Sequence, residues 1–238
     1  MCLGCIIEKD LLLTYLLFKI MALFILIVVL VIAWWIYSKF FRDPSYVRNA
    51  YDGKNQEQKE VIRYFLVDGC MRKKMSDAEY DAFVQKSVPG LKQRGMDKIG
   101  LDEDQLKEIE PVHFEGFVFD KDSYHKKGED GIWRSSKYEV TWLFFSDSQV
   151  YLYKKIMSFD ELKDKEITEE YFYKDITNFS TRSESEEITI DGVTVQVDST
   201  QFRLIVPGDS FSCKMDQNEY TERAVQGMKA KLREKKLA

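Results

Sequence analysis

The pattern of hydrophobic positions changes twice along the chain, and its first part is a continuous apolar run. From Ile20 to Tyr37 no side chain is charged, and Trp34 and Trp35 stand near the end of the run. A helix rises about 1.5 Å per residue, so this run can cross a hydrocarbon core of roughly 30 Å. The exit sequence WWIYSKFF lacks the small residues of a signal-peptide cleavage site. Residues 20–37 are therefore predicted to form a retained transmembrane helix, preceded by an N-terminal flank, residues 1–19.

Residues 38–54 are predicted to be a juxtamembrane linker. After the linker, apolar side chains recur at spacings that place them on one face of a helix. Ser76 and Glu79 have the spacing of a capping box, in which each side chain binds a free amide at the helix start. Residues 55–110 are therefore predicted to be a helical module. Its predicted helices are Asn55–Cys70, a helix after Ser76, Leu91–Met96 and Asp102–Glu108.

From His113 onward apolar and polar positions alternate, which is typical of half-buried strands. Asp191-Gly192 tolerates the positive φ angles of a tight hairpin turn. The polar stretch Asp120–Gly131 is predicted to be a mobile loop, and Gln217–Lys236 an amphipathic closing helix. The predicted strands are His113–Phe119, Tyr138–Phe145, Gln149–Ile156, Glu170–Tyr173, Ile176–Thr181, Ile188–Ile190, Val193–Val197, Gln201–Val206 and Phe211–Met215.

Composition narrows the classes of protein to which the chain can belong. Aromatic residues make up 14% of the chain, which favours a packed β core over a disordered tail. The net charge of -5 and the pI near 5.3 argue against nucleic acid as a partner, because phosphate binding needs a basic surface. The cysteines, at positions 2, 5, 70 and 213, predict neither a disulfide framework nor a metal tetrahedron.

Charges beside the apolar run predict its orientation. Lys39, Arg42, Arg48 and Lys54 follow the run, whereas Lys9 and Lys19 before it are offset by acidic neighbours. The positive-inside rule therefore places the C-terminal portion in the cytoplasm, with the chain in the cell membrane as a single-pass protein. Met21 is an alternative start, and it leaves that preference unchanged because no positive segment then precedes the helix.

Candidate chemistry is sparse in the sequence. His113 and His125 have no local partners for a nucleophile–base pair, and the glycine and distal glutamate of a calcium loop do not accompany Asp102. No catalytic, cofactor-binding or metal-ligating residue is predicted, no cofactor is expected, and the chain is predicted not to be an enzyme. Five basic residues are candidates for contact with anionic headgroups, with a solvated surface as the alternative. They are Arg72, Lys73, Lys74, Lys126 and Lys127.

The run EEYFYKDITNFST, with its turn at Lys174-Asp175, and the closing helix resemble the bacterial pleckstrin-homology-like (PH-like) domains over about Pro111–Lys236. The segments GIWRSSKYEVTWLFFSD and ERAVQGMKAKLREKK are similar to those of single-pass bacterial membrane proteins, a likeness that implies no activity. The resemblance implies an α+β fold in which residues 111–238 form an antiparallel β-sandwich or barrel capped by a C-terminal helix.

In lipid-binding members of that family, basic residues of the first hairpin bind a phosphoinositide. Lys121, Lys126, Lys127 and Arg134 lie in the corresponding stretch, but Ile132 stands where a further cation is expected, which weakens that interpretation. The leading expectation is a membrane-anchored, non-enzymatic binding or scaffold module that holds a protein partner through an edge strand or loop rim. Self-association stays open, because tethering raises local concentration.

Two other functions stay open. One is an enzyme or enzyme subunit with a site between the helical module and the sheet, which a deep pocket with convergent, pKa-shifted side chains would favour. The other is a structural envelope protein that faces outward.

Overall fold

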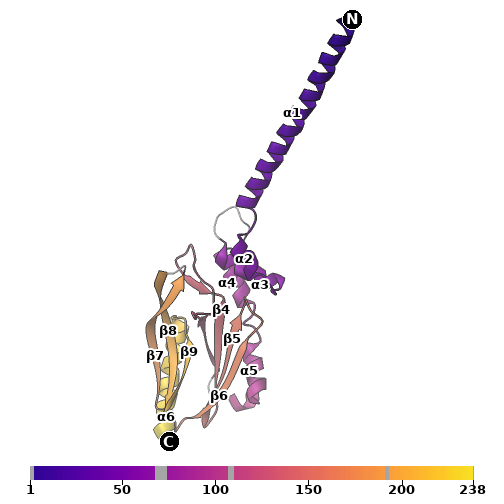
Figure 1. Ribbon diagram of the computed structural model, residues 1–238. Helices are drawn as coiled ribbons and strands as arrows, with labels where there is room; N and C mark the ends of the chain where they lie inside the picture. The colour runs from indigo at the N-terminus through magenta and orange to yellow at the C-terminus, as the bar shows by residue number, and fades with distance from the viewer. Residues whose placement is uncertain (1–2, 68–73, 107–109, 191–192, 238) are drawn as a thin grey trace. The chain divides into compact units, whose positions relative to one another are not determined.

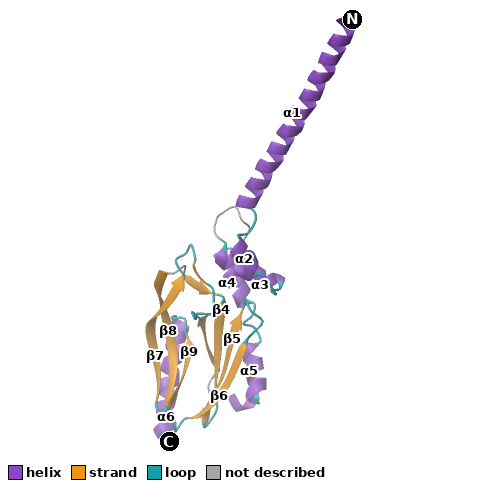
Figure 2. Cartoon of the chain, viewed as in Figure 1, coloured by secondary structure: helices purple, strands orange, loops and turns teal. Residues whose placement is uncertain are grey.

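A computed structural model describes residues 3–67, 74–106, 110–190 and 193–237. These residues divide into two compact units. Of the described residues, one unit comprises residues 3–48 with Val67, and the other comprises Asn49–Leu66 with residues 74–106, 110–190 and 193–237. The fold is mixed α+β, with one N-terminal apolar helix, antiparallel sheets and a C-terminal helix (Figure 2), which confirms the expected class at that level.

Helix α1 spans Leu3–Phe40, so it contains the predicted transmembrane helix and continues into the flank before it. Its stretch Tyr15–Lys39 has a mean hydropathy of 3.2 and is long and apolar enough to cross a membrane. The large apolar side chains of this stretch are exposed, as side chains that contact lipid are. A short helix, α2 (Ser45–Ala50), lies inside residues 38–54, the stretch predicted as a juxtamembrane linker.

Three further helices follow. Helix α3 (Gln56–Leu66) is preceded by Asn55, whose Oδ1 accepts from the Gln58 amide at 2.8 Å while its own amide donates to Gln58 Oε1 at 2.9 Å. Helix α4 (Asp77–Gln85) starts with the predicted capping box of Ser76 and Glu79, which is confirmed. Helix α5 (Leu91–Ile99) ends at Gly100, whose φ of 77° is readily adopted by glycine. The predicted acidic helix is a 3-10 turn, η1 (Glu103–Leu106).

Two antiparallel sheets form the β portion. The four-stranded sheet has the order β1-β4-β5-β6 and the three-stranded sheet the order β7-β8-β9, while β2 and β3 pair as a separate ribbon. Helix α6 (Glu219–Leu237) follows the last strand. The strands are β1 (Val112–Phe117), β2 (His125–Lys127), β3 (Trp133–Ser135), β4 (Lys137–Phe145), β5 (Gln149–Ser158), β6 (Lys165–Phe172), β7 (Asn178–Ile190), β8 (Val193–Val206) and β9 (Asp209–Lys214).

Three strand predictions need correction. Part of the predicted loop Asp120–Gly131 is strand β2. Strand β6 begins at Lys165, five residues before the predicted strand. The breaks predicted between residues 181 and 188 and between 197 and 201 do not exist, because β7 and β8 run through them as one long hairpin. Exposed strand positions need no apolar side chain, so a polar run does not by itself end a strand.

The four-stranded sheet has a hydrophobic core on each face. Leu143 and Leu152 lie in the core shared with the three-stranded sheet and with Val225 and Met228 of α6. Alternate residues of the same strands, such as Val140 and Tyr153, lie in a second core shared with α3, α4 and α5. Figure 1 shows α5 beside β5 and β6, and α6 beside β7. Helices α3, α4 and α5 therefore cover the face of the four-stranded sheet that is turned away from the three-stranded sheet.

Helix α5 approaches β5 very closely at Gly95. A Cβ atom built at Gly95 would lie 2.9 Å from Cγ and Cδ1 of Tyr153, which is closer than van der Waals contact allows. The Tyr153 hydroxyl donates to Glu166 Oε1 at 3.0 Å, and Arg94 Nε and Lys98 Nζ each lie 2.5 Å from an oxygen of that carboxylate. Helix α5 is thus held to the sheet by close backbone packing and by one shared carboxylate.

Candidate functional site

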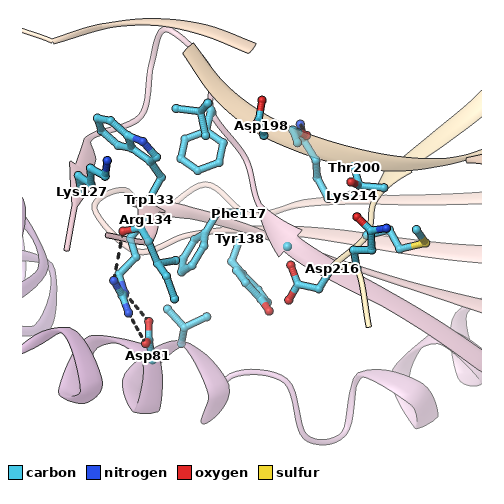
Figure 3. Close-up of a pocket in the computed structure, with 18 of the residues that line it drawn as sticks. Asp81, Phe117, Lys127, Trp133, Arg134, Tyr138, Asp198, Thr200, Lys214 and Asp216 are labelled. Carbon is cyan, nitrogen blue, oxygen red and sulfur yellow. Dashed lines mark hydrogen bonds and ion pairs between the residues drawn. The ribbon is translucent and has the colours of Figure 1, made fainter. Parts of the chain in front are cut away.

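An open pocket of about 840 Å³ lies between α4, the β2–β3 ribbon, β1, residues 196–200 within β8 and the end of β9 (Figure 3). Aromatic rings contribute to it from three elements: Phe117 of β1, Trp133 of β3 and Tyr138 of β4. Asp198 and Thr200 of β8 contribute the polar side away from α4. Its volume falls in the range of roughly 300–1,000 Å³ that small-molecule sites occupy.

The β2–β3 ribbon is fixed to α4 by Arg134. Its Nε and Nη2 donate to the two oxygens of Asp81, each at 2.7 Å, and its Nη1 and Nη2 donate to Asp130 at 2.9 and 2.7 Å. Arg134 is buried, with only 2% of its surface exposed. These hydrogen bonds raise the pKa of the guanidinium and lower the pKa of Asp130 to about 2. One cation thus serves two carboxylates, and the group keeps a net negative charge.

The ribbon approaches this ion-pair group at Gly128. A Cβ atom there would lie 2.3 Å from Arg134 Nη1 and 2.6 Å from oxygens of Asp130 and Asp77. Asp77 accepts from the Glu129 amide at 2.7 Å and from the Tyr64 hydroxyl at 2.8 Å, which joins the ribbon to α3 as well. The segment predicted as a mobile loop is therefore docked on two helices.

The basic residues predicted to face a membrane surface have separate positions. Arg72 and Lys73 lie outside the described residues, and Lys74 is half-buried. The Lys126 ammonium donates to the Tyr64 carbonyl at 3.1 Å and lies 4.6 Å from the centre of the Tyr64 ring. Lys127 is exposed and lies at the pocket. Contact of these residues with headgroups stays a prediction.

Asp216 lines the pocket, and its carboxyl group is close enough to Glu115, which is not a lining residue, to be affected by its charge. Asp216 follows β9, and its amide donates to the Glu115 carbonyl of β1 at 3.1 Å. Desolvation, and then the charge of Glu115, raise the pKa of Asp216 from 3.8 to about 6. Glu115 Oε2 is buried and has no hydrogen-bond partner among the described residues, while Oε1 accepts from Gln85 Nε2 at 3.5 Å. The pair therefore combines excess negative charge with an unsatisfied acceptor.

Tyr138 lies beside this pair. Its hydroxyl accepts from Gln85 Nε2 at 3.4 Å, and its ring points toward the Asp216 carboxylate in Figure 3. Burial, and then the charges of Glu115 and Asp216, raise the pKa of the phenol, so it stays a neutral hydroxyl at physiological pH. A neutral phenol next to carboxylates is a hydrogen-bond donor and an apolar surface in one side chain.

Lys214 is the cation on the opposite side, and its charge is already neutralised. Its ammonium contacts the Glu186 carboxylate and donates to Ser199 Oγ at 2.9 Å. Its backbone amide donates to Glu139 Oε1 at 2.7 Å, and Lys154 Nζ lies 3.4 Å from the other oxygen of Glu139. Gly116 allows the close approach of β1, since a Cβ there would lie 3.1 Å from Lys214 Cβ.

The histidines lie away from the pocket lining. His113 stacks on Trp142 with ring centres 4.6 Å apart, and its Nδ1 lies 3.4 Å from the Tyr220 hydroxyl. His125 Nε2 lies 2.7 Å from Ser123 Oγ, and burial lowers the pKa of its ring. Within the described ranges, no group of three or more His, Cys, Asp or Glu side chains is placed to hold a metal ion.

Sequence reasoning missed the carboxylate pair and the partners of Arg134. Glu115 occupies an ordinary alternating position of β1, and Asp216 comes just before the helix-start residues Asn218 and Thr221. Asp81 precedes Arg134 by 53 residues. No spacing in the sequence signals these contacts, because each depends on how separate elements pack.

Comparison of the chain with models of known protein families, with curated proteins and with solved structures found no match. The resemblance to PH-like domains therefore stays a prediction.

Proposed function

We propose that this chain is a single-pass membrane protein whose C-terminal β portion is a non-enzymatic module that binds a protein partner in the pocket. The observation that carries the proposal is the open, aromatic-lined pocket of about 840 Å³ that strands of both sheets line. Aromatic side chains are enriched where proteins bind proteins, because they bury much area at little entropic cost.

The arrangement of strands supports a PH-like domain as the type of module. The two sheets have the strand orders β1-β4-β5-β6 and β7-β8-β9, and α6 contributes Val225 and Met228 to the core between them. This arrangement is compatible with a β-sandwich closed by a C-terminal helix. The short β2–β3 ribbon would then be an insertion after the first strand. In this chain the insertion is fixed by Arg134 and borders the pocket.

Membrane attachment is the second part of the proposal. The exposed apolar stretch Tyr15–Lys39 supports it, because such a surface in water would drive aggregation. The positive charges after the helix, from Lys39 to Lys54, support a cytoplasmic pocket.

Site-specific photocrosslinking in the full chain tests the binding function. Ile132 lies at the pocket with 56% of its surface exposed, so Ile132→p-benzoylphenylalanine places the crosslinker beside a bound partner. Leu162, which is 81% exposed and lies elsewhere on the same unit, is the matched control position. We expect a discrete protein adduct from native membranes at position 132 and not at 162. Adducts equal at both positions, or to lipid alone, would contradict the proposal.

An enzyme is the second candidate, and one observation favours it. Asp216 has a raised pKa of about 6 and lies near a second carboxylate, that of Glu115. Acid–base catalysts use such an arrangement. Membranes that carry the wild-type chain or Asp216→Asn can be compared for hydrolysis of glycosides, esters and phosphate esters. Turnover that the wild-type chain supports and the variant loses would favour this candidate over the binding module.

A further inference from the structure

Strand β8 has a neighbouring strand on only one side over its N-terminal half. The whole of β8 pairs with β7, but only Gln201–Val206 pair with β9, because β9 ends at Lys214. Residues 193–200 of β8 therefore form an open edge. A strand that lines a cavity with one face contributes alternate residues, whereas every residue from Gln196 to Thr200 lines the pocket. The pocket therefore runs along the open edge of β8.

Backbone groups of this edge are directed to the side where β9 lies farther along the strand. The Thr200 carbonyl accepts from the Met215 amide at 2.9 Å on that side. In an antiparallel ladder this direction repeats at every second residue, which places the amides and carbonyls of Asp198 and Gln196 on the same side. Among the described residues, neither Asp198 nor Gln196 has a backbone hydrogen-bond partner there. These groups are donors and acceptors with the spacing of a strand.

The edge is open because the chain turns away from it after Met215. The next residue, Asp216, donates its amide to the Glu115 carbonyl of β1 at 3.1 Å, so it pairs with the other sheet. Helix α6 follows, and it contributes Val225 and Met228 to the core between the sheets. No strand in the described part of the chain lies beside residues 196–200 on the pocket side.

The outer edge of β7, by contrast, is protected by charge. Charged side chains on an exposed edge discourage the addition of another strand. Strand β7 carries Arg182, Glu184, Glu186 and Glu187, whereas the only charged residue among residues 193–200 of β8 is Asp198. Of the two edges, the one at the pocket is therefore better suited to accept a further strand.

The side chains of the pocket favour an uncharged, partly apolar occupant. The apolar side chain of Val197 is buried at the edge, and Phe117, Ile132 and Trp133 are partly or largely exposed. A strand beside β8 would direct every second side chain to the same face as Val197. Acidic and basic residues of the lining are equal in number, so its formal charges balance: Asp81, Asp198, Asp216, Lys127, Arg134 and Lys214.

We propose that the pocket binds an extended segment of the protein partner as an added strand, paired with the open edge of β8 and with apolar side chains at alternate positions. This inference rests on the proposed binding function and names the conformation and chemistry of the bound segment. In strand addition, main-chain hydrogen bonds supply affinity and alternate side chains supply specificity. At about 3.3 Å per residue, the edge from Gln196 to Thr200 is roughly 13 Å long, which matches a segment of about five residues.

A pair of proline substitutions in the full chain tests the pairing with β8. Gln196→Pro removes an amide that faces the open edge and leaves the hydrogen bonds to β7 in place. Glu187→Pro is the matched control, because Glu187 is the cross-strand partner of Gln196 and its amide faces the outer edge of β7. With the crosslinker at position 132, we expect the partner adduct to fall roughly fivefold or more in Gln196→Pro and to persist in Glu187→Pro. Thermal melting verifies that both variants are folded.

The adduct also supplies a probe that does not depend on a folded variant. The crosslinked segment of the partner is identified by mass spectrometry and synthesised as a peptide, together with a series in which one amide at a time is N-methylated. Binding is measured with the full chain in nanodiscs of neutral phosphatidylcholine. We expect methylation to weaken binding roughly fivefold or more at every second residue and little between, because alternate amides face β8. If Gln196→Pro does not melt like the wild-type chain, this series alone decides.

Failure of this inference can be distinguished from failure of the function on which it rests. An unchanged adduct in a folded Gln196→Pro, equal loss in both proline variants, an N-methyl series without alternation, or an adduct to a second copy of this chain would each overturn the inference. In each of these cases the crosslink at position 132 still shows a protein at the pocket, so the binding module stands. Absence of any protein adduct in the parent chain contradicts the proposed function itself.

Discussion

Arg134 has a structural role, although a basic residue at this position could be mistaken for a ligand-binding one. Its planar guanidinium makes paired hydrogen bonds to Asp81 and Asp130, a geometry that lysine cannot reproduce. The side chain is buried, and both carboxylates remain partly exposed. The arginine therefore fixes the β2–β3 ribbon to α4. Residues that contact the guanidinium, such as Gly128, must be small enough to leave space for it.

Gly128→Ala should loosen this attachment. The added methyl group would displace Arg134 Nη1, so we expect lengthened hydrogen bonds and a loss of about 1–2 kcal/mol in the free energy of unfolding. Hydrogen exchange at the Glu129 amide, which now donates to Asp77 at 2.7 Å, should accelerate. Unchanged exchange at that amide together with unchanged stability would contradict the attachment described for the ribbon.

Asp216→Asn should reveal the cost of ionising this carboxyl group. The folded-state pKa of about 6 lies above the ordinary value of 3.8, so ionisation disfavours the folded state, and the wild-type chain gains stability from this group as pH falls from about 7 to about 4. The charge that acts on it is the carboxylate of Glu115, and burial makes the larger contribution to the raised pKa.

The measurement is the difference in melting temperature between Asp216→Asn and the wild-type chain across that pH range. We expect the variant to melt higher near pH 7.5 and the difference to fade near pH 4, where the wild-type carboxyl is largely protonated. Asp175→Asn, at an exposed turn, controls for the loss of a charge in general. A difference that is constant with pH would show that Asp216 is not perturbed.

Among the structural elements, α5 depends on a glycine where helices usually disfavour one. Alanine is favoured over glycine in a helix interior by about 1 kcal/mol, yet overpacking a core costs about 1–3 kcal/mol. At Gly95 a methyl group would meet the Tyr153 ring at 2.9 Å, whereas at Gly227 of α6 it would meet nothing within 4 Å.

Gly95→Ala and Gly227→Ala should therefore shift stability in opposite directions. The first should lower the free energy of unfolding by about 1–2 kcal/mol, because the clash exceeds the gain in helix propensity. The second should raise it by up to about 1 kcal/mol. Urea denaturation of the full chain in detergent measures both. Stabilisation by both variants would mean that α5 does not approach β5 as closely as described.

Elements with a strong local signal could be predicted from the sequence. The capping box of Ser76 and Glu79 depends on neighbouring residues and was predicted in place, and the strands predicted at Tyr138–Phe145 and Gln149–Ile156 match β4 and β5 to within two residues. The continuity of β7 through Ser183–Glu187 was missed, because exposed strand positions are polar and resemble a loop. The residues that line the pocket were missed because Phe117, Tyr138 and Asp216 come from β1, β4 and the segment after β9, which only tertiary pairing brings together.

For the molecule as a whole, the proposal requires that the pocket-bearing unit and the N-terminus lie on opposite sides of a membrane. The cysteines of the natural chain are poorly suited to test this. Cys213 is buried with 2% of its surface exposed, and burial raises the pKa of its thiol, so it should resist labelling on either side. Cys70 lies outside the described residues.

Leu162→Cys supplies a better reporter, in a chain whose Cys2, Cys5 and Cys70 are replaced by serine. Leu162 is 81% exposed, so its replacement should react readily with maleimide wherever the reagent is present. If the positive charges from Lys39 to Lys54 hold the C-terminal unit inside, an impermeant maleimide should label it only after lysis. A chain that retains only Cys5 should label in intact cells, because the helix carries that end to the other side. Labelling of Leu162→Cys in intact cells would show that the C-terminal unit lies outside. Recovery of the chain from the soluble fraction, cut after Tyr37, would show that the helix does not stay in the membrane as an anchor.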